Sequence, residues 1–161
     1  MKLYYDFYRS QIGTIYICLS SQGVHKVSIT EEDWYKYRQK NNKLIRNTDF
    51  CREAIKEIHE YFIGKRQKFS IPLYIEGTTF QKKVWHQLQS IPYGEIRSYS
   101  QIAIAIGKPH GQRAVGQANR ANPLPIFIPC HRVIGQNGSL IGYAGTKIDI
   151  QRYLLQLEGY L

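Results

Sequence analysis

The sequence predicts an α+β protein with a small N-terminal antiparallel sheet and a helix, followed by a mainly helical C-terminal domain that contains a helix-turn-helix. Two observations predict this class. The first thirty residues form short β-patterned runs separated by turn residues, and the second half consists of short amphipathic segments bounded by Gly and Pro. A chain of 161 residues with 43% hydrophobic residues is long enough to form packed cores for one or two such domains.

The predicted sheet is a β-meander. Its strands cover residues 3–8, 13–19 and 24–29, and the turn Ser20-Ser21-Gln22-Gly23 separates the last two. The following residues, 31–47, are rich in charge and predict a loop or a frayed helix.

A helix is predicted next, from about Asp49 to Ile63, with Thr48 as its cap and Gly64 as its end. Apolar side chains recur along it at helical spacing and predict a buried stripe of Phe50, Ala54, Ile58, Tyr61 and Phe62.

An extended connector is predicted over residues 69–79, because this segment contains Pro72 and Gly77 and lacks a helical period. We therefore place the domain boundary near residues 72–78. The expected domains are an N-terminal α/β structural domain at 1–75 and a C-terminal domain at 76–161.

The C-terminal domain begins with an amphipathic helix marked by Phe80, Val84, Trp85 and Leu88, which ends at Ile91-Pro92-Tyr93-Gly94. Two short helices follow. Ser98 or Ser100 caps the first, which ends at Gly107-Lys108-Pro109, and the second runs from near Gly111 to Asn122-Pro123. Such a pair predicts a helix-turn-helix, whose second helix usually enters a DNA groove. Small residues on that helix would allow close approach to a duplex: Ala114, Gly116 and Ala118.

The distribution of charge also favours a polyanionic partner. The formal net charge is +10, and from Ile96 through Ile148 the chain contains no Asp or Glu. The basic residues in this window are Arg97, Lys108, Arg113, Arg120, Arg132 and Lys147. Because each neutralised phosphate releases counterions, this pattern favours nucleic acid over a merely solvated basic surface.

Cys130 lies in this window, within Ile128-Pro129-Cys130-His131-Arg132-Val133-Ile134-Gly135. A thiol with an ordinary pKa is mostly protonated at neutral pH, and neighbouring His131 and Arg132 are groups that can activate it. The alternative is that Cys130 is only a small buried hydrophobe. The segment before it, Pro123 to Pro129, predicts an apolar strand-like link that fixes the distance from the second helix.

A last helix is predicted from about Asp149 to Leu157, with Gly159 as its C-cap. Glu158 stands at its C-terminus, where a carboxylate is unfavourable for the helix dipole. Glu158 is therefore a candidate partner of His131 in a Cys-His-Glu relay, although an ordinary exposed residue is the simpler interpretation of its position.

Residues 78–159 resemble the DNA-binding and active-site domain of the O6-alkylguanine-DNA alkyltransferases. The resemblance depends on six groups of residues: Thr78-Thr79-Phe80-Gln81-Lys82-Lys83-Val84-Trp85, Tyr93-Gly94-Glu95-Ile96-Arg97-Ser98-Tyr99, Arg113-Ala114-Val115-Gly116-Gln117-Ala118, Asn122-Pro123-Leu124-Pro125 through Pro129-Cys130-His131-Arg132, Gly142-Tyr143-Ala144-Gly145, and Leu154-Leu155-Gln156-Leu157-Glu158-Gly159. It implies direct repair of DNA, in which the alkyl group on guanine O6 moves irreversibly to the cysteine, after nucleotide flipping and without cofactor or metal. The resemblance leaves open whether O4-alkylthymine is a second substrate.

The resemblance also implies residue roles. Cys130 is the alkyl acceptor, His131 takes its proton through a bridging water, and Glu158 orients the histidine. Asn122 ties the turn before the cysteine to its surroundings, and Tyr99 hydrogen-bonds the flipped guanine. Arg113 enters the duplex and fills the space that the nucleotide leaves. We expect further DNA contacts from Arg120, Ala114, Gly116 and Tyr99, and a substrate pocket formed by Tyr143, Ala144 and the carbonyl of Val133.

Some positions depart from the family's pattern. Gln151 stands where the family commonly has a lysine, and one residue is inserted between Tyr143 and Glu158, near Gly145-Thr146. These differences concern the rim of the pocket. Of the zinc-binding pattern found in some members only His25 is retained, with Cys18 out of register, so we expect no metal and no other cofactor.

The expected partner is double-stranded DNA that contains alkylated guanine. No apolar run approaches the roughly 20 residues that span a bilayer, so we expect no membrane attachment. We also expect a monomer. Three widely spaced cysteines predict free thiols in a reducing compartment, which means the cytoplasm, or the nucleus if the source is eukaryotic.

Three other functions remain as alternatives. A non-catalytic sensor of alkylated guanine would not need Cys130. A Cys-His hydrolase would need an oxyanion hole and repeated turnover, and this function would leave the basic window unexplained. A helix-turn-helix regulator of transcription would leave Pro129-Cys130-His131-Arg132 unexplained.

Overall fold

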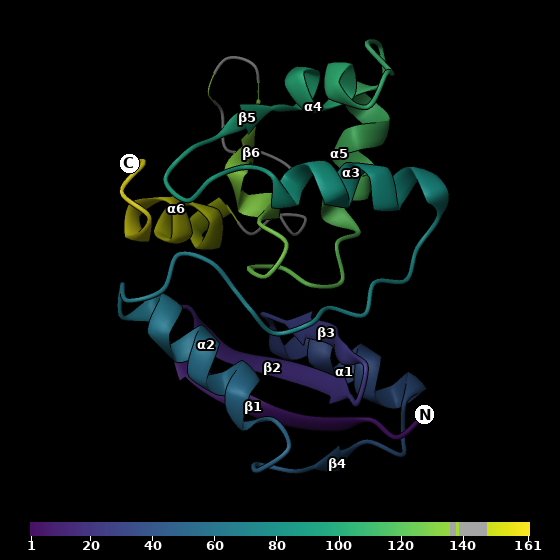
Figure 1. Ribbon diagram of the computed structural model, residues 1–161, viewed down its shortest axis with the longest axis vertical. Helices are drawn as coiled ribbons and strands as arrows, with labels where there is room; N and C mark the ends of the chain where they lie inside the picture. The colour runs from purple at the N-terminus through teal and green to yellow at the C-terminus, as the bar shows by residue number, and fades with distance from the viewer. Residues whose placement is uncertain (136–137, 139–147) are drawn as a thin grey trace. The chain divides into compact units, whose positions relative to one another are not determined.

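The computed structural model describes residues 1–135, 138 and 148–161, which form two compact units, Met1–Ile75 and Glu76–Leu161. Figure 1 shows a sheet with flanking helices in the first unit and a cluster of short helices in the second. The α+β class predicted from the sequence is confirmed. Among the described residues, no helix is both long and apolar enough to cross a membrane.

The sheet of the first unit has the strand order β3-β2-β1-β4. Its three long strands, β1 (Tyr4–Ser10), β2 (Gly13–Ser20) and β3 (Gly23–Ser28), pair antiparallel and form the predicted meander. The fourth strand, β4 (Ile45–Arg46), runs parallel to β1 and makes the sheet mixed. The sequence did not predict β4, because two exposed residues have no periodicity to detect.

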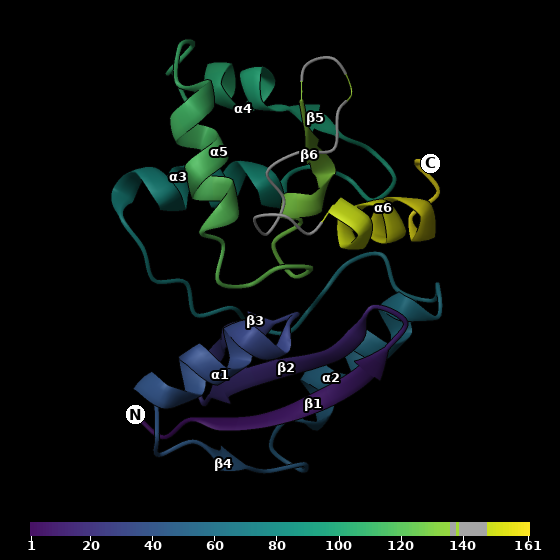
Figure 2. The same cartoon turned by 180° about the vertical axis from the view of Figure 1, so that it is seen from behind.

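Helix α1 (Glu31–Lys40) lies on one face of this sheet, and a second helix lies on the opposite face, as the two views in Figures 1 and 2 show. The segment predicted as a loop or a frayed helix is thus a regular helix. Its N-cap is Thr30, whose side chain accepts a hydrogen bond from the amide of Asp33. Its anchor is the buried Trp34, which stacks on Tyr16 of β2 with ring centroids 4.7 Å apart. One aromatic anchor gives little helical periodicity, which is why the sequence left the choice open.

The helix on the other face is α2 (Arg52–Phe62), which buries Ala54, Ile58, Tyr61 and Phe62 as predicted. Its predicted start was wrong. Residues 48–51 form a turn in which the side chain of Asn47, and not Thr48, accepts from the amide of Phe50, at 2.9 Å. Phe50 is therefore outside the helix and 38% exposed. Gly64, at φ 76°, ends the helix as expected.

The connector after α2 is held to the first unit. Buried Glu57 accepts hydrogen bonds from the amides of Ser70 and Ile71, at 2.9 and 3.2 Å. The amide of Val24 donates to the carbonyl of Pro72 at 2.9 Å, and a Cβ on Gly23 would lie 2.5 Å from the same oxygen. Only glycine permits this close approach, which explains the residue at the start of β3.

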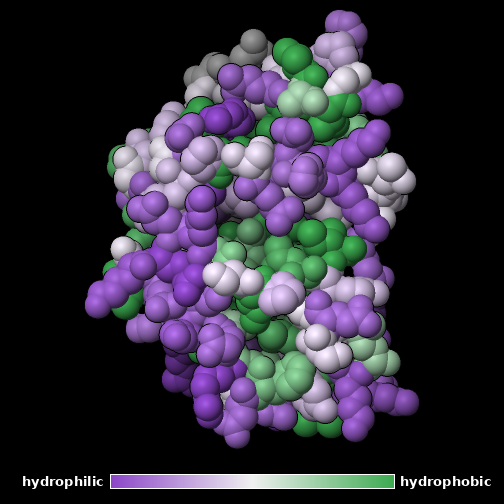
Figure 3. All heavy atoms as spheres, in the orientation of Figure 1, coloured by the Kyte–Doolittle hydropathy of each residue, from purple (hydrophilic) through white to green (hydrophobic). Residues whose placement is uncertain are grey.

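The second unit contains α3 (Thr79–Gln89), α4 (Tyr99–Ala105), α5 (Gln112–Arg120) and α6 (Ile148–Leu157). Capping boxes begin two of these helices: Thr78 with Gln81 at α3, and Ser98 with Gln101 at α4, so Ser98 and not Ser100 is the cap. Helices α4 and α5 form the predicted helix-turn-helix. Hydrophilic residues cover much of the outward surfaces of α2 and α3 in the view of Figure 3.

Two short elements complete this unit and place its central loop. Strands β5 (Arg97–Ser98) and β6 (Val133–Ile134) pair in parallel, with Arg97 opposite Val133. The 3-10 turn η1 (Cys130–Arg132) leads directly into β6. Buried Trp85 of α3 donates through Nε1 to the carbonyl of Ala118, at 2.8 Å, and so fixes α5 against α3.

Candidate active site

The loop before Cys130 is a compact buried turn, and the predicted strand-like link was wrong. The amide of Ile128 donates to the carbonyl of Leu124 at 2.8 Å, and Ile126 has φ 78°. A β-branched residue in this region costs about 1–3 kcal/mol, so tertiary packing imposes the conformation. Asn122 supports the turn, since its Nδ2 donates to the carbonyl of Ile128 and its Oδ1 accepts from the amide of Leu124, both at 2.9 Å.

Cys130 begins η1 and is 2% exposed. Burial raises the pKa of its thiol to about 12, and hydrogen bonds from Asn122 and from the backbone oppose this shift only in part. The thiol is therefore protonated at rest. Arg132 directs its charge to Glu158 and not to this thiol, so burial outweighs the contacts that lower the pKa of Cys130. Activation by His131 stays a prediction.

Glu158 is fully buried at its side chain and joins His131 and Arg132. His131 Nε2 lies 2.7 Å from Glu158 Oε2, while Arg132 donates through Nε to Oε1 at 2.8 Å and through Nη2 to Oε2 at 3.0 Å. The structure thus brings His131 and Glu158 together, and Glu158 is not an ordinary exposed residue.

The charges of this group fix its protonation. Burial alone would raise the pKa of Glu158, but the hydrogen bonds and charges of His131 and Arg132 outweigh it and hold the pKa well below its usual range. Burial lowers the pKa of His131, against the opposing effect of Glu158. Glu158 is therefore a carboxylate and His131 a neutral imidazole at neutral pH. Because a carboxylate only accepts, Nε2 of His131 carries the hydrogen.

Arg132 acts as a structural clamp. Its Nη1 donates to the carbonyl of Ile91 at 2.6 Å, and its guanidinium lies 5.7 Å from the ring centroid of Tyr93. Together with the two bonds to Glu158, these contacts join the end of α3, η1 and the end of α6. Arg97 also meets an acid, Glu95, at 3.3 Å. Arg97 and Arg132, both basic residues of the acid-free window, are therefore paired with acids that lie outside it.

Gln151 of α6 holds η1 from the other side. It is completely buried, and its Nε2 donates to the carbonyls of His131 and Val133, at 3.1 and 3.0 Å. Sequence reasoning noted Gln151 only as a departure at the pocket rim. In the structure, its two hydrogen bonds hold the turn that carries the thiol. The carbonyl of Val133, predicted to line the substrate pocket, accepts one of these bonds.

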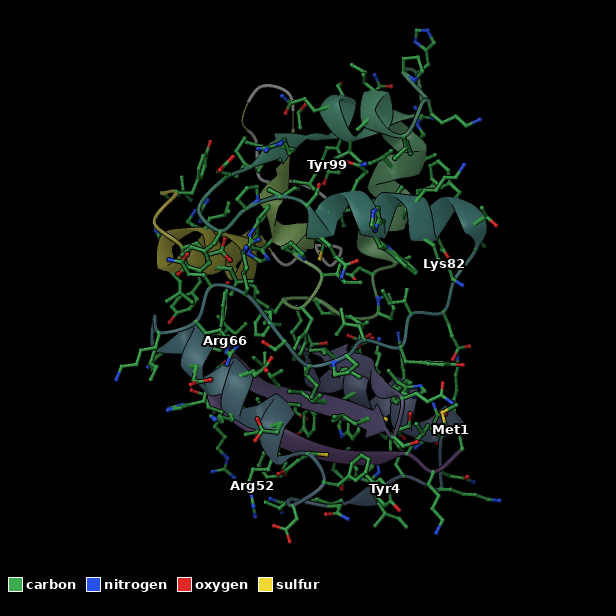
Figure 4. All side chains as sticks on the ribbon, viewed as in Figure 1. Met1, Tyr4, Arg52, Arg66, Lys82 and Tyr99 are labelled. Atoms are coloured by element: carbon green, nitrogen blue, oxygen red, sulfur yellow. The ribbon has the colours of Figure 1, made fainter. Side chains whose placement is uncertain are left out.

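Tyr99 is the first residue of α4, at the junction with β5 (Figure 4). Burial raises its pKa, and the nearby Cys130 thiol adds to the shift, while Arg120 and a side-chain hydrogen bond with Asn119 oppose it. Asn119, 1% exposed on α5, donates to the carbonyl of Cys130 at 3.3 Å. Sequence reasoning missed Asn119, because an asparagine in a helix carries no signal of the loop it will meet.

Helix α5 exposes most of its other predicted residues, but Ala118 is only 3% exposed and packs inside the unit, so the prediction that it allows close approach to a duplex was wrong. Arg113 and Ala114 are exposed in its first turn, and Arg120 is exposed at its end. Gly116 is half-buried, and a Cβ there would lie 3.8 Å from the ring of Tyr99, an ordinary contact. Packing within the protein therefore does not require glycine at this position.

The predicted pocket residues Tyr143 and Ala144 lie outside the described residues, as do Gly145 and Thr146. Among the residues that the structure does describe, no group of three His, Cys, Asp or Glu side chains is arranged to hold a metal. His25 contacts Ser20 Oγ at 2.6 Å through Nε2 and stacks on Tyr74, with centroids 4.2 Å apart.

Comparison with known families identifies both units. Residues 3–75 match the 6-O-methylguanine DNA methyltransferase ribonuclease-like domain, and residues 79–160 match the DNA binding domain of the same methyltransferase. The chain belongs to the 6-O-methylguanine DNA methyltransferase family. The resemblance inferred from residues 78–159 is therefore confirmed, and it extends to the N-terminal unit.

Relatives in this family cover nearly the whole chain. The constitutive methylated-DNA–protein-cysteine methyltransferase of Bacillus subtilis is 46% identical over 96% of this chain and 94% of its own. The Methanosarcina acetivorans enzyme of the same name is 44% identical over 98% and 99%. The crystal structure of Mycobacterium tuberculosis OGT in complex with DNA has a TM-score of 0.86 and 38% identity, over 96% of this chain and 92% of that one.

Proposed function

We propose that this protein is a methylated-DNA–protein-cysteine methyltransferase that repairs O6-alkylguanine by transferring the alkyl group to Cys130. One observation carries the assignment of the acceptor: Cys130 is buried beside a neutral His131 whose orientation is fixed by the buried carboxylate Glu158. A buried, protonated thiol needs a base, and an imidazole held in one tautomer supplies it.

The proposed transfer begins when His131 takes the thiol proton through a bridging water. Since Nε2 is engaged by Glu158, Nδ1 is the nitrogen that accepts this proton. The sulfur then attacks the alkyl carbon, an S–C bond forms, the C–O6 bond breaks, and the electron pair leaves with the guanine. Glu158 stabilises the imidazolium that forms. A proton returns to the guanine, so a thiol and O6-methylguanine give an S-methyl thioether and guanine.

The resting state limits unwanted chemistry. With its pKa raised to about 12, Cys130 is a poor nucleophile until a substrate is bound and its proton is removed. The product thioether has no easy route back to the thiol. We therefore expect one irreversible turnover for each molecule, without cofactor or metal.

The proposed partner is double-stranded DNA, bound by the second unit. Helix α5 enters the duplex as the second helix of a helix-turn-helix, and its exposed Ala114 and side-chain-free Gly116 allow close approach. Arg120 contacts phosphate, and Arg113 fills the space left by the flipped nucleotide. Flipping is required because an alkyl group inside a stacked duplex is out of reach of a buried thiol.

Tyr99 and Asn122 complete the proposed site. Tyr99 hydrogen-bonds the flipped guanine and stabilises its departing charge, while Asn122 holds the turn that presents Cys130. Tyr143, Ala144 and the carbonyl of Val133 form the pocket walls. The first unit has a structural role, and the protein acts as a monomer. Cys18, Cys51 and Cys130 are all free thiols, which fits the cytoplasm, or the nucleus of a eukaryote.

Intact-mass measurement tests this proposal. After incubation with duplex DNA containing O6-methylguanine, we expect the protein to gain one methyl group, on the peptide that contains Cys130 and in a 1:1 ratio to repaired base. Cys130→Ser should gain none. Tight binding of the damaged duplex without a mass change in the wild type would instead indicate a damage sensor, and a methyl group on another residue would refute the assignment of Cys130.

A further inference from the structure

Asn119 lies between two residues that the proposed reaction uses. It is located on the inner side of α5, 1% exposed, and reaches both the carbonyl of Cys130 and the side chain of Tyr99. It does not touch solvent, and its position has no part in the transfer as described above.

The contact with Cys130 fixes the orientation of this amide. A backbone carbonyl only accepts hydrogen bonds, so the atom 3.3 Å from it must be the NH2 group and not the side-chain oxygen. The same carbonyl also accepts from the amide of Val133, which closes η1. Asn119 Oδ1 is then buried, and it has no hydrogen-bond partner in the structure.

Tyr99 reaches the same amide from the side of α4. Its ring lies against α5 at Gly116, one turn before Asn119, where a Cβ would be 3.8 Å from the ring. The side chain of Asn119 lowers the pKa of Tyr99, which is the direction expected of a donor near the phenolic oxygen. Since Oδ1 has no hydrogen-bond partner, the NH2 group that donates to Cys130 is also the group of Asn119 that can act on Tyr99.

We propose that Asn119 is a positioning residue that donates to the phenolic oxygen of Tyr99 and so turns the Tyr99 O–H toward the flipped guanine. A phenol that accepts a hydrogen bond along one direction directs its own proton along another. In this arrangement Tyr99 acts as a donor to the guanine as its C–O6 bond breaks. The inference rests on the proposed function, because it assigns a role in the same transfer.

The unpartnered oxygen argues against a purely structural role. An unsatisfied buried polar atom is costly, and leucine, which has the same branching as asparagine, would occupy a similar volume without that cost. The NH2 group is the part of the side chain that the position uses. Its two acceptors, the backbone of the nucleophile and the phenol, are held at a fixed separation by one planar group.

The test is a double-mutant cycle on the rate of methyl transfer from a duplex that contains O6-methylguanine. Asn119→Leu should slow transfer about 10-fold, the order expected for losing one hydrogen bond that acts on developing charge. Tyr99→Phe should slow it by at least as much. In the Tyr99→Phe background, Asn119→Leu should change the rate less than about 2-fold, because its effect passes through the phenol.

A second reaction separates this role from disturbance of Cys130. Methylation of Cys130 by methyl iodide needs the thiolate but no proton donor for the leaving group, so Asn119→Leu should leave its rate within about 2-fold of wild type. Asn42→Leu makes the same change at an exposed position of the first unit and is the matched control, which should change neither rate. Asn119→Ala removes the same donors and repeats the measurement if the leucine variant does not fold.

Two results would overturn the inference. The first is that Asn119→Leu slows transfer equally in the wild type and in the Tyr99→Phe background. The second is that it slows methylation by DNA and by methyl iodide equally. Either would show that Asn119 acts on the turn that carries Cys130, while the proposed function would stand. If the wild type transfers no methyl group from DNA but Cys130 still reacts with methyl iodide, the proposed function fails first.

Discussion

The cysteines of the two units share their burial but differ in their neighbours. In the first unit burial raises the pKa of Cys18 to about 11 and that of Cys51 to about 12. In the second unit it raises the pKa of Cys130 to about 12. A low resting pKa therefore does not single out the proposed acceptor. Cys18 meets the hydroxyl of Tyr37, whereas Cys130 is followed by an imidazole bonded to a buried carboxylate.

The same contrast holds for buried carboxylates. Asp6 in the first unit pairs with Arg46, a side chain that is 52% exposed. In the second unit, Glu158 and both of its partners are buried almost completely. Two buried amide oxygens without a partner, on Asn119 and Gln151, also lie in the second unit. Both units bury polar groups, since Glu57 and Ser28 are buried in the first, but in the second unit three ionisable side chains form one buried cluster beside the turn that carries Cys130, at a cost in stability.

Removing the base should have the largest effect. We expect His131→Asn to slow methyl transfer from DNA by about 10²–10⁴-fold, because Cys130 then resembles Cys18 and Cys51 and no group takes its proton. Single-turnover kinetics measure this. His59→Asn in the first unit, where His59 Nδ1 contacts Tyr8 Oη at 3.0 Å, is the control and should leave the rate unchanged. A normal rate in the His131 variant would show that the neighbouring imidazole is not what distinguishes Cys130 from Cys18 and Cys51.

The two ion pairs should differ in stability. Arg132→Ala leaves the buried carboxylate of Glu158 with one partner fewer, and we expect a loss of about 3–5 kcal/mol in the free energy of unfolding. Arg46→Ala removes a half-exposed partner of Asp6 and should cost about 1 kcal/mol. Urea denaturation of both variants measures the difference. Equal losses of unfolding free energy would mean that Arg132 stabilises the second unit no more than Arg46 stabilises the first.

The smallest effect is a dependence of stability on pH. The pKa of His131 is lowered in the folded state, so its contribution is present above the unfolded value of about 6.5 and is lost as the pH falls through the lowered value. The contribution of Glu158 is lost in the same direction, below the unfolded value of about 4.3.

The cysteines act in the opposite sense. Because burial raises their pKa values, their contribution is complete below about 8.5 and declines as the pH rises toward the folded values. Denaturation across this range should therefore show a loss of stability on both sides. In a His131→Asn variant the loss near pH 6 should shrink while the alkaline loss remains, and an unchanged acid limb would contradict the lowered pKa of His131.

Much of the fold follows from local patterns. Alternation predicted the three strands of the meander, apolar spacing predicted α3, a serine cap predicted α4, and flanking Gly and Pro residues predicted α5, because each signal lies within a few neighbouring residues. The misses have long-range causes. Strand β4 exists only because β1 offers an edge, α2 begins late because Asn47 forms a turn, and the loop at Ile126 is strained by its packing.

By itself the sequence determined the fold class, the helix pair, the basic window and the place of Cys130, since these depend on composition, spacing and short motifs. Only the tertiary structure decided which groups meet. It paired Arg132 with Glu158 and not with the thiol, brought Gln151 to the carbonyls of η1, and set Asn119 between Tyr99 and Cys130. Hydrogen bonds and pKa shifts act over a few ångströms, and residues separated by tens of positions reach that range only after the chain has folded.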